Sequence, residues 1–244
     1  MTDSHIYKPF DQELQTLASS VGAMGDFAGA QFADSIQALL RGDLTLAQRV
    51  IDQDRQLDAL RRDLSSAAAS VIARRQPMAI DLNEVLADFR ISDQLERIGD
   101  LAKNIAKRAT AIARGSIPSD IAEMLERLST LAADMLKRAL DAISAGDAEK
   151  ALLARQLDEE IDQLHTEIFR ELVSRMSADQ TDVINFVHLL FCAKNIERIG
   201  DHATNIAEAA YFKVTGQRPP LERRRLDESS LMRSGDILVK TKLT

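Results

Sequence analysis

A fifteen-residue segment that occurs twice is the feature that most restricts how this chain of 244 residues can fold. The copies are LERIGDLAKNIAKRA at 95–109 and IERIGDHATNIAEAA at 196–210, and ten of the fifteen positions are identical. A second pair of related segments, DRQLDAL at 54–60 and DEEIDQL at 158–164, precedes the two copies at nearly the same separation. The chain is therefore predicted to contain two structurally similar halves.

Apolar residues between the breaks in the chain recur at the spacing of an α-helix. Around the first copy they step by three or four positions: Ile91, Leu95, Ile98, Ala102, Ile105, Ala109 and Ile112. Gly-Asp pairs at 42–43 and 146–147 combine a residue suited to a left-handed C-cap with one suited to an N-cap. Pro77 and the Gly-Ser-Ile-Pro sequence at 115–118 mark two further breaks. We predict helices near 8–41, 44–76, 81–114, 118–145, 147–177 and 180–214.

These helices predict an all-α protein in which two tandem three-helix units form a six-helix bundle. Ala, Leu, Arg, Glu and Gln, which favour helices, together make up nearly half of the chain, and short turns between long helices favour antiparallel neighbours. The first unit is predicted at 8–114 and the second at 118–215. The tail at 216–244 contains Pro219 and Pro220 near its start and loses helical periodicity, so we expect it to be mobile.

The composition restricts the possible classes of function. Apolar residues make up 45% of the chain and charged residues 28%, a balance that favours a folded core over disorder. The net charge of −7 argues against direct nucleic-acid binding, which requires clustered basic residues. The sequence has no apolar run long enough for a membrane span and no signal-peptide core at its N-terminus. With the single cysteine Cys192, a cytoplasmic protein without an internal disulfide is expected.

Eight acidic residues form four pairs with a spacing of four residues, which places both members of each pair on one face of a helix. Antiparallel packing would bring the two pairs of a unit together, and four carboxylates repel each other unless protons, basic side chains or cations neutralise them. Oxygen-rich groups of this kind bind Mg, Mn or Fe. The predicted metal ligands are Asp54, Asp58, Glu96 and Asp100 in the first unit and Asp158, Asp162, Glu197 and Asp201 in the second.

Two alternatives to a metal-binding regulator remain open. Acidic pairs on a long helix commonly form only a solvated surface, where Arg55, Arg97 and Arg198 would supply salt bridges. A di-iron enzyme of the ferritin-like class would need Glu-x-x-His on two helices, and the chain contains no such sequence. It also lacks a nucleophile elbow, a phosphate-cradling glycine loop and a zinc signature. We therefore predict no enzymatic activity, no catalytic residue and no cofactor-binding residue besides the metal ligands.

Several single residues within the predicted helices are assigned to packing. Gly99 and Gly200 interrupt good helices at a cost of about 1 kcal/mol each relative to alanine, and a close helix contact is the preferred explanation. Alternatively, the missing side chains admit a cation or a partner backbone. His202 corresponds to Leu101 in the first copy, so we expect it to be packed or partly exposed rather than a ligand. Cys192 is expected in the core.

The two ERIGD segments, the Gly-Asp turns and RVIDQDRQLDALRRDLSSAAASVIARRQP at 49–77 closely resemble the PhoU family of regulators of bacterial phosphate uptake. The resemblance covers roughly 8–215, and the family's Glu/Asp-x-x-x-Asp motif is matched by the four acidic pairs. The tail after 215 departs from the family pattern.

The resemblance implies a cytoplasmic, dimeric, non-catalytic helical adaptor. Such proteins act as negative regulators of the phosphate-starvation (Pho) response and of phosphate homeostasis. They connect the ATPase subunit of the phosphate ABC importer to a sensor histidine kinase, and they reach the membrane only through these partners. The resemblance also implies multinuclear clusters of metals such as Fe, Zn, Mn or Mg on the acidic motifs. A metal-dependent helical enzyme and a purely structural scaffold remain the alternative hypotheses for the function.

Overall fold

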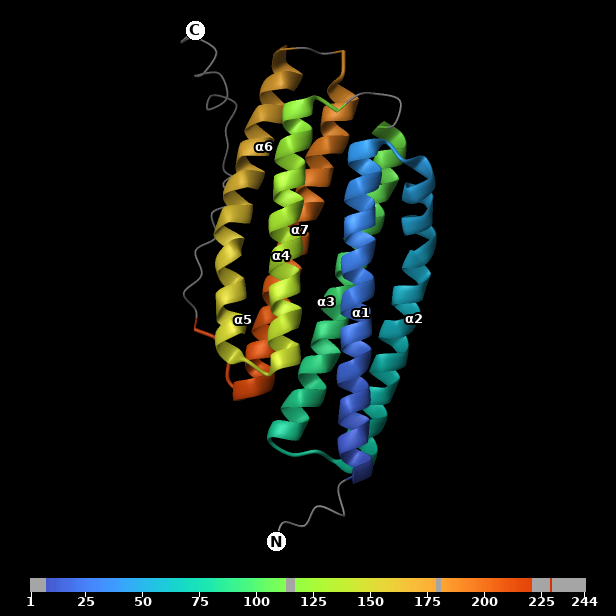
Figure 1. Cartoon of the computed structure of the whole chain (residues 1–244), viewed down its shortest axis with the longest axis vertical. Helices are drawn as coiled ribbons and strands as arrows, with labels where there is room; N and C mark the ends of the chain where they lie inside the picture. The colour runs from blue at the N-terminus through green and yellow to red at the C-terminus, as the bar shows by residue number, and fades with distance from the viewer. Residues whose placement is uncertain (1–7, 113–116, 179–180, 221–228, 230–244) are drawn as a thin grey trace.

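A computed structural model describes residues 8–112, 117–178, 181–220 and 229. Within these residues the backbone is almost entirely helical and contains no β-strand, which confirms the predicted all-α class. The elements in chain order are α1 (Lys8–Arg41), α2 (Leu44–Arg75), α3 (Ile80–Ile112), α4 (Ser119–Ala145), α5 (Ala148–Ala154), the 3₁₀ turn η1 (Arg155–Leu157), α6 (Asp158–Ala178) and α7 (Val183–Thr215) (Figure 1).

The two Gly-Asp turns have the cap geometry that the sequence predicts. Gly42 and Gly146 have positive φ angles of 64° and 58°, which glycine adopts without steric cost. Asp43 caps the next helix by accepting a hydrogen bond of 2.9 Å from the backbone N–H of Leu46. Asp147 accepts a corresponding bond of 3.0 Å from the N–H of Lys150. These caps hold α1 to α2 and α4 to α5 as antiparallel neighbours.

The fifth predicted helix is interrupted. We predicted a continuous helix at 147–177, whereas α5 and α6 are separated by η1, a single 3₁₀ turn. The segment contains no glycine or proline, so no helix-breaking residue in the sequence predicts this turn. It closes through a hydrogen bond from the N–H of Asp158 to the carbonyl of Arg155. Short 3₁₀ stretches within a helix change the direction of the side chains that follow.

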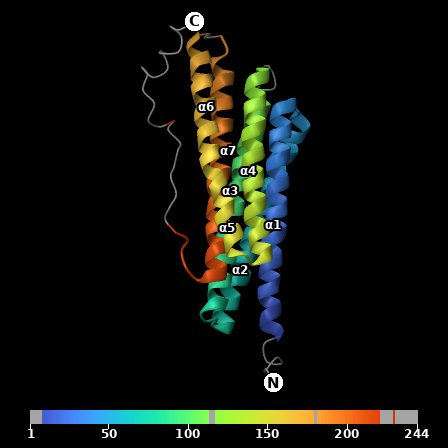
Figure 2. The ribbon, with the colours of Figure 1, turned by 60° about the vertical axis from the view of Figure 1, so that its left-hand side comes forward.

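The helices α3 and α7 lie side by side in opposite directions at the centre of the bundle (Figures 1 and 2). The helices α1 and α4 flank this pair and contact each other as well. The helix α2 packs on α1 and α3, and α5 and α6 pack on α4 and α7, so they form the two outer edges. Both copies of the repeated segment are therefore central, because each lies on one helix of the α3/α7 pair.

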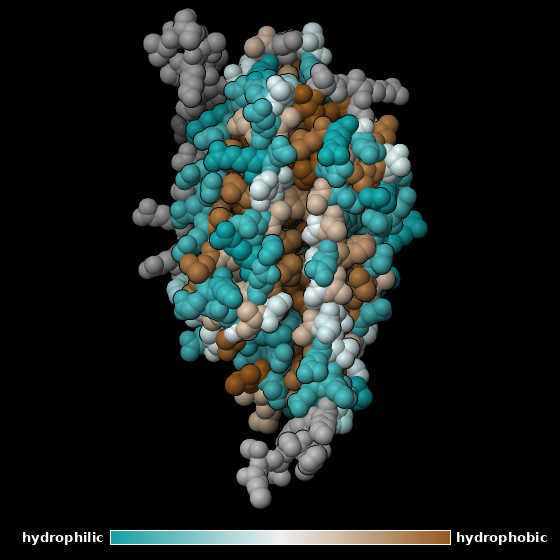
Figure 3. Space-filling model, viewed as in Figure 1, coloured by the Kyte–Doolittle hydropathy of each residue, from teal (hydrophilic) through white to brown (hydrophobic). Residues whose placement is uncertain are grey.

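One continuous apolar core runs through both units. The predicted helical stripe of α3 is fully buried at Ile91, Leu95 and Ile98. Cys192 of α7 is also in this core, and burial raises the pKa of its thiol to about 12. On the face shown in Figure 3, apolar side chains follow the seam between α1 and α4. The sequence-predicted core is confirmed, and the two units share it.

Close packing explains Gly99 and Gly200. A Cβ atom at Gly99 would lie 2.4 Å from Cδ2 of Leu57 on α2 and 2.9 Å from Oε1 of Gln31 on α1. A Cβ atom at Gly200 would lie 3.0 Å from Cδ1 of Ile161 on α6. Each glycine therefore allows the helix before the repeated segment to approach the segment itself.

Most of the predicted tail lies outside the described residues. Residues 221–228 and 230–244 are not described, so the predicted mobility of 216–244 stays a prediction. Before this gap, Gly216 ends α7 with a φ of 68°, and its N–H bonds the carbonyl of Phe212 at 2.8 Å. The carbonyl of Pro220 accepts a bond of 3.3 Å from Arg155.

Gly99→Ala is expected to destabilise the protein by about 1–2 kcal/mol, because the clash with the buried Leu57 side chain exceeds the gain in helix propensity. Gly22→Ala is the matched control, since a Cβ atom there meets nothing within 4 Å, and it should stabilise α1 by about 0.5–1 kcal/mol. Urea denaturation followed by circular dichroism gives both values. A Gly99→Ala variant as stable as Gly22→Ala would contradict the packing explanation.

Candidate functional site

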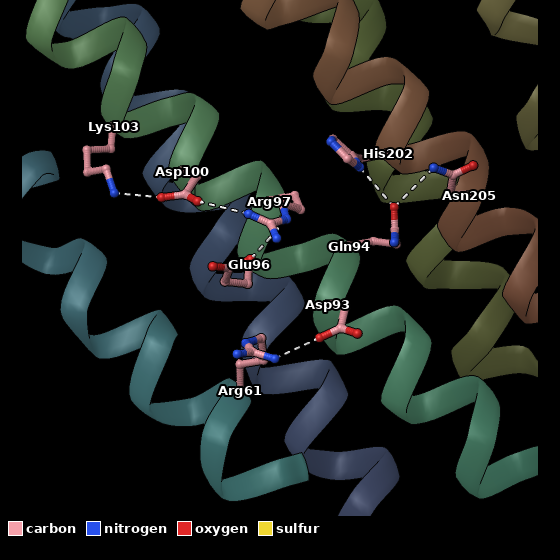
Figure 4. Close-up of polar contacts among 9 residues, drawn as sticks. All are labelled: Arg61, Asp93, Gln94, Glu96, Arg97, Asp100, Lys103, His202 and Asn205. Carbon is pink, nitrogen blue, oxygen red and sulfur yellow. Dashed lines mark hydrogen bonds and ion pairs between the residues drawn. The ribbon is translucent and has the colours of Figure 1, made fainter.

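The four predicted ligands of the first unit lie together at the contact between α2 and α3. Nζ of Lys103 lies 2.6 Å from Oδ2 of Asp54 and 2.6 Å from Oδ1 of Asp100. Burial opposes the charge of this ammonium, but its hydrogen bonds to Asp100 and Asp54 raise the pKa of Lys103. Two carboxylates from different helices thus converge on one cation, part of which Figure 4 shows.

Glu96 and Asp58 extend this acidic group along the same contact. Burial raises the pKa of Glu96; Arg97 opposes this effect, while the negative charges of Asp100 and Asp58 add to it. Arg97 lies 3.5 Å from Oε2 of Glu96 and 3.6 Å from Oδ2 of Asp100 (Figure 4). The two helices therefore bring their acidic pairs together as predicted, and Arg97 forms the salt bridges that the surface alternative requires.

The second unit neutralises its acidic pairs differently. Asp158, Asp162 and Glu197 are buried and Asp201 is half-buried. Oγ1 of Thr204 donates to Oδ1 of Asp158 at 3.0 Å, and Thr204 stands at the position of Lys103 in the repeat. The second unit thus has a hydroxyl where the first has an ammonium.

Lys194 supplies an ammonium to one of these acids, with Nζ 2.9 Å from Oε1 of Glu197. Lys194 corresponds in the repeat to Asp93, which instead forms an ion pair of 2.9 Å with Arg61 (Figure 4). The charges around the two acidic groups have therefore diverged, although the acids themselves recur in both copies.

The chemistry of the donor set suits a hard metal ion, but the ligands are not preassembled. Within the described ranges, no group of three or more His, Cys, Asp or Glu side chains is arranged to hold a metal ion. In the first unit, however, Asp54 and Asp100 already direct one oxygen each toward a single cationic nitrogen. A multivalent ion prefers the same carboxylate oxygens. The metal role of the eight predicted ligands stays a prediction.

Polar side chains join the two units along α3 and α7. Oε1 of Gln94 on α3 accepts a bond of 3.0 Å from Asn205 and lies 2.9 Å from Nδ1 of His202, both on α7 (Figure 4). Because this oxygen accepts, Nδ1 of His202 carries the proton. Burial and then the charge of Arg198 lower the pKa of His202. His202 is half-buried, as expected, and it is a bonding partner between the units.

Charged contacts lie at both ends of the α3/α7 pair. Nζ of Lys213 lies 2.7 Å from Oδ1 of Asp88 and 3.2 Å from Oε1 of Glu84. Burial raises the pKa of Asp88, whose exposed fraction is 0%, and Lys213 opposes this shift. At the other end, Arg108 lies 3.2 Å from Nδ1 of His188 and 4.0 Å from the ring centroid of Phe191. Sequence reasoning missed these residues because they differ between the two copies.

The PhoU domain model matches the chain twice, over residues 21–109 and 125–210. The chain belongs to the PhoU family. The resemblance drawn from the ERIGD segments is thereby confirmed, and each PhoU match contains one copy of the repeated segment.

Relatives of this PhoU-family chain match it over almost their whole length. A phosphate-specific transport system accessory protein PhoU homolog from Rhizobium meliloti is 47% identical over 96% of this chain and 99% of that protein. A protein of the same description from Caulobacter vibrioides is 43% identical over 91% of this chain and 97% of that protein.

Two crystal structures of PhoU proteins share the fold. PhoU from Pseudomonas aeruginosa is 33% identical, with a TM-score of 0.82 over 85% of this chain and 100% of that structure. The phosphate transport system regulatory protein PhoU from Streptococcus pneumoniae is 27% identical, with a TM-score of 0.80 over 87% of this chain and 100% of that structure. Among the helices that the structure describes, none is long and apolar enough to cross a membrane.

Lys213→Met is expected to cost about 3 kcal/mol at neutral pH, because it leaves the buried carboxylate of Asp88 without its nearest counterion. The folded pKa of Asp88 lies above its unfolded value of 3.8, so folding favours the protonated acid. Stability from this group is therefore lost as the pH rises through the folded pKa. The cost of Lys213→Met should shrink as the pH falls through that pKa.

Urea denaturation at neutral and acidic pH measures this effect. The control is Lys137→Met, which removes an exposed ion pair of 2.6 Å with Asp141 and should change stability by less than about 1 kcal/mol. A cost of Lys213→Met that is the same at both pH values would contradict the role assigned to the buried Asp88.

Proposed function

We propose that this PhoU-family protein is a non-catalytic adaptor that represses the phosphate-starvation (Pho) response and limits high-affinity phosphate uptake. The observation that carries the proposal is its near full-length similarity to relatives described as phosphate-specific transport system accessory proteins. Its partners would be the ATPase subunit of the phosphate ABC importer and a sensor histidine kinase. It would act in the cytoplasm as a homodimer and reach the membrane through these partners.

The side-chain environment supports a binding role rather than catalysis. In the first unit, Lys103 and Arg97 already neutralise Asp54, Asp100 and Glu96, so these carboxylates are engaged in ion pairs. General acid–base catalysis instead needs a carboxyl group within reach of a substrate proton. An adaptor must bind its partners with different affinities in their different states, because only a difference in affinity shifts the output of a kinase.

Metal ions are a second part of the proposal. Fe, Zn, Mn or Mg would bind the acidic pairs of each unit and hold α2 against α3 and α6 against α7. In the first unit the ion would replace the ammonium of Lys103 between Asp54 and Asp100. In the second unit no ammonium occupies the position of Thr204, so the two sites would differ in affinity.

Lys103→Gln is expected to raise the affinity of the first unit for Mn²⁺ at least about tenfold, because it removes the cation that competes for Asp54 and Asp100. Asp100→Asn combined with Asp201→Asn should lower the amount of bound metal. The measurement is equilibrium dialysis of EDTA-stripped protein against Mn²⁺, followed by elemental analysis. Lys137→Gln is the control, since it removes a paired lysine on α4, a helix that carries none of the predicted metal ligands. Equal Mn²⁺ affinities of the Lys103→Gln and Lys137→Gln variants would contradict a metal site between Asp54 and Asp100.

The regulatory proposal is tested in cells grown with abundant phosphate. Deleting the gene should switch on a phosphate-starvation reporter such as secreted phosphatase activity, and restoring the wild-type chain should switch it off. Complementation with the Asp100→Asn/Asp201→Asn variant separates the two parts of the proposal. If this variant silences the reporter without binding metal, the proposed adaptor role stands and the proposal that it needs metal ions is refuted. A reporter that stays silent after deletion would contradict the adaptor role.

A further inference from the structure

A cavity of about 820 Å³ opens where the two units meet and is lined by an unusual set of basic side chains. The helix α3 contributes Arg90 and Gln94, and η1 contributes Arg155. The helix α7 contributes Glu208 and Phe212, and Arg218 follows α7. Three arginines and one glutamate leave these residues with a net charge of +2, whereas the whole chain has a net charge of −7. The cavity is therefore a positively charged site on an acidic protein.

The arginines retain unused capacity to bind an anion. Arg155 lies 3.3 Å from Oε1 of Glu208, but its Nε is buried and has no hydrogen-bond partner among the described residues. Arg90 lies 5.2 Å from the ring centroid of Phe212 and forms no ion pair with any acid in the described part of the chain. The exposed Arg218 likewise has no acidic partner there. Among the side chains that the structure describes, only one of the three guanidinium groups, that of Arg155, is therefore paired with a carboxylate.

The side-chain amide of Gln94, which also lines the cavity, has donors to offer. Its Oε1 is occupied by His202 and Asn205, which leaves both N–H groups of Nε2 for another acceptor (Figure 4). An oxyanion accepts from guanidinium and amide N–H groups alike. The ring of Phe212 adds an apolar surface on which an uncharged part of a ligand can pack.

We propose that this cavity binds the phosphoryl group of a small molecule. A carboxylate would neutralise one positive charge, whereas a phosphoryl dianion matches the net charge of +2 and supplies enough oxygens for several donors. A ligand there would touch α3 of the first unit, α7 of the second unit and the 3₁₀ turn η1 together. Its binding would therefore favour one packing of the two units, as an effector of a regulatory protein must. The inference does not depend on the proposed adaptor partners.

The test uses the full chain in EDTA, so that metal ions do not contribute. Radiolabelled inorganic phosphate and radiolabelled ATP are equilibrated with the protein by dialysis at physiological ionic strength. Saturable binding of one ligand per chain is expected for at least one probe. Arg90→Gln combined with Arg218→Gln should weaken it about tenfold or more. Both substitutions are on side chains that line the opening, and circular dichroism checks that the helical fold is kept.

Arg127→Gln combined with Arg138→Gln is the matched control. These exposed arginines of α4 lie outside the cavity, and their removal changes the net charge by the same amount. Binding of phosphate identifies the free anion as a ligand, and binding of ATP alone identifies a phosphate ester. The proposal is overturned if neither probe binds saturably at millimolar concentration, or if both double variants weaken binding equally.

Discussion

The antiparallel contact between α3 and α7 is the interaction on which the rest of the structure depends. Apolar side chains fill its middle, and the core that they form continues into every other helix of the bundle. The ion pair between Lys213 and Asp88 lies at one end of this contact, and the hydrogen bond between Arg108 and His188 lies at the other. The duplicated segments therefore lie at the centre because each supplies one face of the same contact. A shift of α3 relative to α7 would therefore move residues of both acidic groups and of the basic cavity, since each of these includes residues of α3 or α7.

Duplication produced two acidic groups, and their neutralising partners have since diverged. The first group contains its own cation in Lys103, whereas Thr204 takes that position in the second. Arg61 and Asp93 form an ion pair in the first unit, and their counterparts in the second are His165 and Lys194. Two sites with the same acids but different internal charges would bind the same ion with different strengths. The family's shared motif thus permits unequal sites within one chain.

Much of the fold was predictable because its signals are local. The Gly-Asp turns, the helical stripe of α3 and the close approach at Gly99 all followed from nearby residues, and the structure confirms them. The 3₁₀ turn η1 was missed because no breaker residue marks it. The contacts of Gln94 were also missed, since they join residues more than 100 positions apart, and Gln94 and His202 both differ from their counterparts in the other copy. The metal role of the acidic pairs stays a prediction, although the first unit gathers its acids as expected.

Apart from the interruption at η1, the sequence by itself determined the helices, the duplicated architecture and the acidic faces, because periodicity, capping and spacing act within a few turns of one helix. The PhoU family membership was also readable from short segments. Only the tertiary structure decided that Lys103 lies between Asp54 and Asp100, and that Arg90 and Arg155 meet at one cavity. The physical reason is that these contacts depend on the rotation and relative height of whole helices. Those quantities are set by core packing across the two units, which no local pattern encodes.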